Sequence, residues 1–155
     1  MENIQKVSLL FILSLLISSF QNIQGKEHKI EFKSLPPYIN IPTDVQQIYQ
    51  DRDGFIWFAT RNGVCRFDGY ELEIIKSNLY TPGALSSNDI LAIQEDYQHR
   101  LWIGTSYGLN MLDKKSGKIQ KEFGVLNNER VQSILITKDN TIWLGTGSSL
   151  YKSNN

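Results

Sequence analysis

The sequence repeats itself around three tryptophans, Trp57, Trp102 and Trp143, which lie 45 and then 41 residues apart. Residues 55–64 read FIWFATRNGV, residues 100–109 read RLWIGTSYGL, and residues 141–150 read TIWLGTGSSL. Twelve residues before each tryptophan, a β-branched residue opens an apolar run; these are Val45, Ile90 and Val131. Self-similarity at a fixed period of this size is typical of a repeat architecture, in which neighbouring units bury a shared core.

Each repeat carries the pattern of short strands separated by tight turns, without helical periodicity after residue 26. Asp-Gly and Asp-Asn turns, such as Asp53-Gly54 and Asp139-Asn140, suit hairpins because these residues tolerate positive φ. We predict strands at 45–50, 55–60, 64–67, 72–76, 90–95, 100–105, 109–112, 119–123, 131–136, 141–146 and 150–152. Four antiparallel strands per period form one blade of a β-propeller, so the predicted fold is all-β.

The tryptophan strands predict how the blades would stack. In residues 55–60, Phe55, Trp57 and Ala59 point to one side of the sheet and the alternate residues to the other, and both sides are largely apolar. A sheet that is apolar on both faces lies between two others. We therefore interpret Trp57, Trp102 and Trp143 as the structural core between blades. The small residues Ala59, Gly104 and Gly145 would let a neighbouring chain approach closely.

The chain divides into three segments. Residues 1–25 hold a short apolar stretch, VSLLFILSLLISSF, after Lys6, which is typical of a secretory signal peptide and too short to span a membrane comfortably. Residues 26–44 form a lead-in segment that alternates briefly before Pro36-Pro37. Residues 45–155 form an incomplete propeller with repeats at 45–89, 90–130 and 131–155.

The number of blades is too small for a closed ring. The chain supplies about two and a half to three blades, whereas propellers close at about 4–8. We expect an amino-terminal fragment of a longer protein, or a truncated product of one. The alternative is a three-bladed protein that assembles with copies of itself.

The net charge and the few reactive residues exclude several classes of partner and site. The formal net charge is +0, so we expect no nucleic-acid partner in this segment. The single cysteine, Cys65, excludes an internal disulfide, and its repeat equivalents are Asn110 and Tyr151. His28 and His99 lack partners at metal-ligand spacing, and the turn from Asp51 to Gly54 lacks the further oxygen ligands of a calcium loop. We therefore predict no metal, no cofactor and no catalytic residue.

The repeat resembles a known family. The segment from Asp51 to Val64 reads DRDGFIWFATRNGV and continues with Phe67-Asp68-Gly69-Tyr70, which is similar to the two-component regulator propeller repeat. The second copy, from Leu85 to Leu109, resembles it more closely. The third departs from it, because Thr137 replaces the leading aspartate and Ser149 the late glycine.

This resemblance implies the periplasmic sensor part of a hybrid two-component protein of Bacteroidetes, anchored in the inner membrane as a homodimer. The implied ligand is an oligosaccharide, and the implied output is signalling to a cytoplasmic histidine kinase and transcriptional regulator absent from this chain. The implied partners are the remaining propeller blades of the parent protein. The chain itself is expected not to be an enzyme.

Ligand contacts are expected where the repeats differ, in their loops. We predict Arg61, Asn62 and Tyr107 as ligand-binding residues, with Tyr80 as a further candidate. Two other functions remain open. A propeller enzyme such as a streptogramin-type lyase resembles this repeat in strand pattern, and would need a general base for which His99 is the candidate. A scaffold for protein contacts is the other.

Overall fold

The computed structural model describes residues 29–78, 80–81, 83–121 and 123–153. The predicted signal peptide, residues 1–25, and His28 lie outside these ranges. The chain separates into two compact units, Met1–Ser34 and Leu35–Asn155. The described residues of the first unit, 29–34, contain neither helix nor strand.

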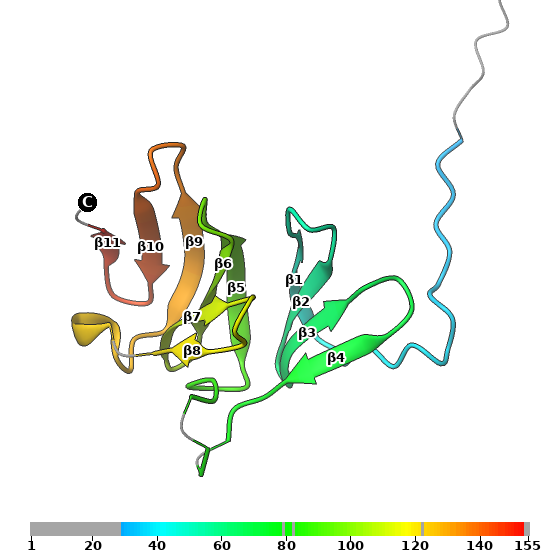
Figure 1. The fold of residues 1–155 in the computed structure, drawn as a ribbon, viewed down its shortest axis with the longest axis horizontal. Coiled ribbons are helices and arrows are strands. Elements are labelled where there is room, and N and C mark those ends of the chain that lie inside the picture. The colour runs from blue at the N-terminus through cyan, green and yellow to red at the C-terminus, as the bar shows by residue number, and fades with distance from the viewer. Residues whose placement is uncertain (1–28, 79, 82, 122, 154–155) are drawn as a thin grey trace, which may run out of the picture. The chain divides into compact units, whose positions relative to one another are not determined.

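The second unit consists of three antiparallel sheets, one for each repeat (Figure 1). The first two sheets have four strands each and the third has three, in the orders β1-β2-β3-β4, β5-β6-β7-β8 and β11-β10-β9. We refer to them as blades 1, 2 and 3. The strands are β1 (Val45–Gln50), β2 (Ile56–Thr60), β3 (Gly63–Phe67), β4 (Leu72–Ile75), β5 (Ile90–Glu95), β6 (Arg100–Thr105), β7 (Gly108–Asp113), β8 (Ile119–Gln120), β9 (Val131–Ile136), β10 (Ile142–Thr146) and β11 (Leu150–Lys152).

The predicted fold class, an all-β partial propeller, is confirmed, with one strand shorter than expected. The sequence predicted a strand over 119–123, but β8 ends at Gln120. Phe123 instead packs against the Trp102 ring, with the two centroids 5.3 Å apart. The chain then turns at Gly124, whose φ is +59°, into the 3₁₀ turn η1 (Gly124–Leu126). Aromatic packing therefore ends the outer strand early.

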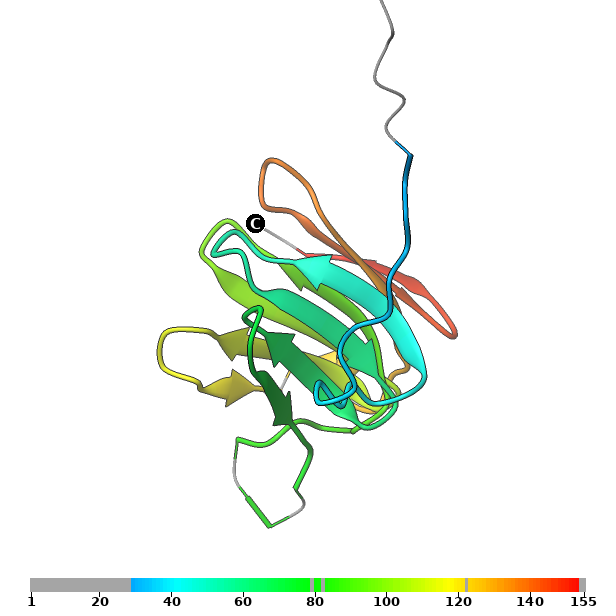
Figure 2. The ribbon, with the colours of Figure 1, turned by 90° about the vertical axis from the view of Figure 1, so that its right-hand side faces the viewer.

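The blades stack face to face through their apolar sides. Strand β5 lies beside both β1 and β9, so the first strands of the three blades are neighbours (Figures 1 and 2). Between blades 1 and 2 the core contains Trp57, Val64, Ile93 and Leu101. A second core, between blades 2 and 3, contains Trp102, Val131 and Leu144.

The three tryptophans differ in how well they are covered. Trp57 is 2% exposed against blade 2, and Trp102 is 7% exposed against blade 3. Trp143 is only half-buried, because no further blade lies on its face within the described residues. Burial therefore follows blade stacking and not the position of the tryptophan in its own strand.

Two close contacts hold adjacent blades in register. A Cβ built on Gly104 would lie 2.6 Å from the Val131 carbonyl oxygen, so only glycine allows β6 to approach β9 this closely. The Gln47 side chain accepts a hydrogen bond from the Ile93 N–H at 2.7 Å and donates one to the Ile93 carbonyl at 3.1 Å. This second contact joins β1 to the backbone of β5 across the blade boundary.

Candidate functional site

The blades have two ends, and different residues gather at each. At one end the turns between second and third strands meet the loops that connect consecutive blades. The Gly63 N–H donates to the Asn88 carbonyl at 2.8 Å, and the Gly108 N–H donates to the Glu129 carbonyl at 2.7 Å. We call this the connecting-loop end. The turns between first and second strands and between third and fourth strands lie at the other end, which we call the hairpin end.

A threonine in each repeat shapes the turn at the connecting-loop end. Thr60 accepts a hydrogen bond from the Asn62 N–H at 3.1 Å and donates to the Gly63 carbonyl at 2.7 Å. Thr105 repeats this arrangement with the Tyr107 N–H and the Gly108 carbonyl, at 3.0 and 2.9 Å. The two residues between threonine and glycine therefore lie at the tip of the turn, with their side chains free of the sheet.

The three predicted ligand-binding residues all lie at these tips. Arg61 and Asn62 are exposed on the turn of blade 1, and Tyr107 is 54% exposed on the turn of blade 2. Asn62 and Tyr107 occupy equivalent positions in adjacent repeats. The backbone geometry thus presents one guanidinium, one amide and one phenol ring at the same end of the stack. Tyr80, the further candidate, is exposed in the loop between blades 1 and 2.

Charged and hydroxyl groups surround these tips. Asp89 and Arg130 directly precede the first strands of blades 2 and 3, and Arg130 Nη1 lies 3.6 Å from Asp89 Oδ2. Ser87 and Ser106 share a hydrogen bond of 2.9 Å. These groups combine cationic, anionic and neutral hydrogen-bonding chemistry at one surface, which suits a polar ligand better than an apolar one.

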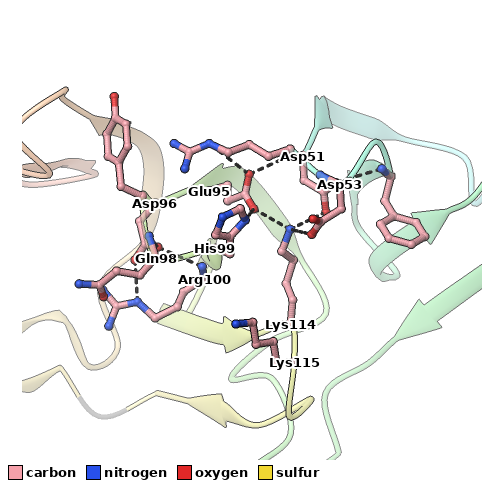
Figure 3. A network of polar contacts seen from close by, with 12 residues as sticks. Asp51, Asp53, Glu95, Asp96, Gln98, His99, Arg100, Lys114 and Lys115 are labelled. Atoms are coloured by element: carbon pink, nitrogen blue, oxygen red, sulfur yellow. Dashed lines mark hydrogen bonds and ion pairs between the residues drawn. The ribbon is translucent and has the colours of Figure 1, made fainter.

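The hairpin end carries a cluster that sequence analysis did not predict (Figure 3). Lys114, in the turn between β7 and β8, donates to Asp51 Oδ2 at 2.9 Å and to Asp53 Oδ2 at 2.6 Å, both in blade 1. Its Nζ also lies 2.6 Å from Glu95 Oε1 in blade 2. We call Asp51, Asp53, Glu95 and Lys114 the lysine cluster. No sequence pattern predicts this cluster, because Lys114 lies 61 to 63 residues from its two partners in blade 1.

Most of the charged groups of the lysine cluster are buried between blades 1 and 2, so their pairing affects the stability of this interface. The side chains of Asp51 and Glu95 are 0% exposed and that of Lys114 is 10% exposed. Burial lowers the pKa of Lys114, but its bonds to Asp53, Glu95 and Asp51 outweigh burial and raise the pKa above its ordinary value. Burial also raises the pKa of Asp51, yet hydrogen bonds from Trp57 and Lys114 outweigh it and hold the pKa below its ordinary value. Both groups are therefore charged at neutral pH.

The first aspartate of each intact motif also anchors its tryptophan. Asp51 Oδ2 accepts from Trp57 Nε1 at 2.8 Å, and Asp96 Oδ2 accepts from Trp102 Nε1 at 2.9 Å. Asp51 Oδ1 additionally accepts from two backbone N–H groups in its turn at 3.0 Å. One carboxylate thus fixes both the hairpin turn and the indole ring six residues later. In blade 3, Thr137 occupies this position and bonds within its own turn.

His99 lies next to the lysine cluster. Its Nδ1 lies 3.4 Å from Glu95 Oε1, and ligand atoms of Asp53, Glu95 and His99 all lie within 4.8 Å of one another. Sequence analysis found no metal-ligand partner for His99, and the structure brings these carboxylates to it. The Lys114 ammonium already provides a cation at 2.6 Å from both Asp53 and Glu95. This single positive charge offsets part of the negative charge of the carboxylates.

The comparisons with known proteins agree with this geometry. The family model for the two-component regulator propeller matches residues 41–62, 84–107 and 125–148, one match in each blade. The chain carries the repeats of this family. The propeller repeat explains the shared Asp–Trp bond and the threonine-shaped turn as features of one recurring unit. A search of curated proteins returned no match.

Solved structures share the propeller fold. The extracellular domain of BT3049, assigned as a hybrid two-component system of B. thetaiotaomicron, has a TM-score of 0.64 at 21% identity over 77% of this chain and 18% of its own. That of BT4673, assigned likewise in the same organism, has a TM-score of 0.60 at 23% identity over 72% of this chain and 15% of its own. Virginiamycin B lyase of Staphylococcus aureus has a TM-score of 0.53 at 18% identity over 84% of this chain and 46% of its own.

These likenesses concern the fold. The chain spans 15% to 18% of the length of the two extracellular domains. Among the described residues, no helix has the length and apolar character that crossing a membrane requires.

Proposed function

We propose that this chain is part of the ligand-sensing propeller of an exported hybrid two-component sensor. The observation that carries the proposal is the occurrence of three consecutive two-component regulator propeller repeats, each folded as a blade. The fold likeness to extracellular domains assigned to such systems supports the periplasmic location. The parent protein is anchored in the inner membrane, dimerises, and passes the signal to a cytoplasmic histidine kinase and transcriptional regulator.

The proposed ligand is an oligosaccharide bound at the connecting-loop end. Arg61 and Asn62 offer several N–H donors for sugar hydroxyl groups. Tyr107 offers a ring face on which an apolar sugar face can stack, together with a polar hydroxyl. All three lie at turn tips that Thr60 and Thr105 hold in place, so the donors are positioned before the ligand arrives.

The remaining partners in this proposal are the other blades of the parent propeller. Trp143 on blade 3 is half-buried, whereas its equivalents in blades 1 and 2 are covered by the next blade. A further blade on this face would continue the same stacking. Propellers close at about 4–8 blades.

The alternative function, a streptogramin-type lyase, would need His99 as its general base, and the position of His99 does not support this role. His99 lies beside Glu95 in the turn between β5 and β6, at the hairpin end, whereas the exposed turn tips lie at the connecting-loop end. The likeness to virginiamycin B lyase extends to the fold alone. We therefore retain ligand sensing as the proposed function.

The test is oligosaccharide binding by the complete exported region of the parent protein. A glycan array identifies the ligand class, and calorimetry then compares wild type with Arg61→Ala and Tyr107→Ala. Each variant should weaken binding by about tenfold or more, as loss of one well-placed polar or stacking contact does. Lys115→Ala, at the hairpin end, is the matched control and should bind as wild type. Equal binding by all four proteins would refute this site.

A further inference from the structure

Glu95 has a buried carboxylate oxygen that accepts no hydrogen bond. Its side chain is 0% exposed, and its Oε2 accepts from the Arg52 N–H at 3.0 Å. Among the described residues, none donates a hydrogen bond to its Oε1. Lys114 Nζ lies 2.6 Å from Oε1 as a charge contact, without the alignment of a hydrogen bond. A buried carboxylate oxygen with unused lone pairs is costly, so this position favours a further ligand.

His99 brings a nitrogen to the same oxygen. Its Nδ1 lies 3.4 Å from Glu95 Oε1, and the imidazole is half-exposed. Two ligands of a tetrahedral zinc ion lie about 3.4 Å apart when each is about 2.1 Å from the metal. Asp53 of blade 1 supplies a third ligand atom, and the atoms of all three residues lie within 4.8 Å of one another (Figure 3). Two carboxylates and one imidazole, with a fourth position for water, form a ligand set that zinc accepts.

The charges around this point are unbalanced. The carboxylates of Asp51, Asp53 and Glu95 surround the single ammonium of Lys114, at 2.9, 2.6 and 2.6 Å. The Arg52 guanidinium is farther away, with its Nε 3.9 Å from Glu95 Oε2, and its side chain is 40% exposed. Two of the three carboxylates are 0% exposed, so water screens their excess negative charge poorly. A divalent cation would supply the charge that one ammonium does not.

A cavity beside the cluster gives an ion access to these groups. It has a volume of about 330 Å³, lies between blades 1 and 2, and is lined by Asp53, His99 and Lys114 among others. Lys114 reaches the carboxylates from the turn between β7 and β8 (Figure 3). Because Lys114 borders the cavity, its ammonium can withdraw from Asp53 and Glu95 while it stays paired with Asp51. The cavity also has space for a water molecule as the fourth ligand.

The three ligand residues belong to one blade boundary and not to the repeat. Asp53 comes from the hairpin turn of blade 1, and Glu95 and His99 flank the equivalent turn of blade 2. At the boundary between blades 2 and 3, the equivalent positions hold Gln98, Ile136 and Asn140. None of these three side chains is a carboxylate or an imidazole. The boundary between blades 2 and 3 therefore offers an internal comparison that lacks the ligand set.

We propose that Asp53, Glu95 and His99 bind a zinc ion that links blades 1 and 2. One carboxylate from each blade and His99 Nδ1 hold the ion, and water completes a tetrahedron. Zinc replaces the Lys114 ammonium at Asp53 and Glu95, and Lys114 remains with Asp51. The site lies at the hairpin end, so it is separate from the proposed ligand site on the turn tips of the connecting-loop end.

Zinc titration of the purified chain, freed of metal with a chelator, tests this proposal. Calorimetry should show one zinc ion per chain. Losing an outer-shell partner alone weakens metal binding by about 10- to 100-fold, so His99→Ala and Asp53→Asn should each weaken it by about 100-fold or more. The matched controls are His28→Ala, which removes the other histidine, and Asp139→Asn, the equivalent of Asp53 in blade 3. Both should bind zinc as wild type does.

Cobalt replaces zinc as a spectroscopic probe of the ligands. A tetrahedral cobalt complex absorbs visible light, and this absorption should be present in wild type and His28→Ala and absent in His99→Ala. Tryptophan fluorescence in chelator checks that each variant is folded. Calcium or magnesium binding in place of zinc, unaffected by His99→Ala, would overturn the proposal, because an imidazole ligand favours zinc over these ions.

Lys114→Met separates metal binding from simple pairing of charges. The ammonium competes with zinc, so its removal should tighten zinc binding by about tenfold or more. Zinc should raise the urea midpoint of wild type, raise that of Lys114→Met further, and leave that of His99→Ala unchanged. A dissociation constant weaker than about 1 mM in wild type would overturn the proposal. Equal zinc affinity in wild type and His99→Ala, or weaker binding in Lys114→Met, would overturn it as well.

Discussion

Replacing Lys114 tests whether the lysine cluster holds blades 1 and 2 together. Lys114→Met keeps an unbranched side chain, one atom shorter, and removes the ammonium that lies 2.9 Å from Asp51 and 2.6 Å from Glu95. Both carboxylates are 0% exposed and would lose their cation, whereas Asp53 is half-exposed and contributes little. Breaking a buried ion pair costs about 3–5 kcal/mol.

The lower end of that range applies, because both carboxylates keep other partners. Asp51 retains its bond from Trp57, and Glu95 retains one from the Arg52 N–H at 3.0 Å. We therefore expect Lys114→Met to lower the free energy of unfolding by about 3 kcal/mol at pH 7. Urea unfolding followed by tryptophan fluorescence measures it. Lys115→Met, in the same turn but exposed, should stay within about 0.5 kcal/mol of wild type.

The loss in free energy of unfolding caused by Lys114→Met should also depend on pH. Lys114 helps to hold the pKa of Asp51 below its ordinary value, so the stability that Asp51 provides is present above that ordinary value and is lost as pH falls through the lowered one. In Lys114→Met, Asp51 can protonate without losing a cation, so the difference in stability from wild type should shrink below about pH 4. A variant as stable as wild type at pH 7, or a cost unchanged at pH 3.5, would refute the role assigned to the cluster.

Three further outcomes are expected. Gly104→Ala should destabilise the chain by about 1–3 kcal/mol, because its Cβ would lie 2.6 Å from a backbone oxygen of blade 3, whereas Gly147→Ala meets nothing within 4 Å and should be neutral in thermal melts. Cys65 is 0% exposed and burial raises the pKa of its thiol, so a thiol reagent should modify it only in denaturant. Asp96→Ala should cost about 1–3 kcal/mol in urea unfolding, by leaving a buried indole N–H without its acceptor at 2.9 Å; a neutral result would show that the bond is dispensable.

The blades were predictable because their signals are local and repeated. The tryptophan strand, the Asp-containing turn and the small residue after it recur in order, so the strand boundaries followed within about two residues except at β8. At β8 the sequence IQKEF suits a strand, and only packing of Phe123 against Trp102 in three dimensions ends it early.

The polar contacts between blades were not predictable from the repeat. Lys114 differs from its equivalent in blade 1, Gly69, and its partners lie in another blade, so no spacing rule connects them. The contact between Gln47 and Ile93 was equally unpredictable, because the residue equivalent to Gln47 in blade 2 is Ala92, which cannot form it. Residues that break the repeat thus make the contacts specific to one interface.

Amide hydrogen exchange at Ile93 tests blade stacking most directly. The Ile93 N–H donates to the Gln47 side chain in blade 1 and not to a strand of its own blade, so its protection reports on the neighbouring blade alone. We predict slow exchange at Ile93 in the wild type, and faster exchange at this amide, with little change elsewhere in β5, in Gln47→Ala. Exchange at the rate of an unprotected amide in the wild type would contradict the stacking of the repeats as propeller blades.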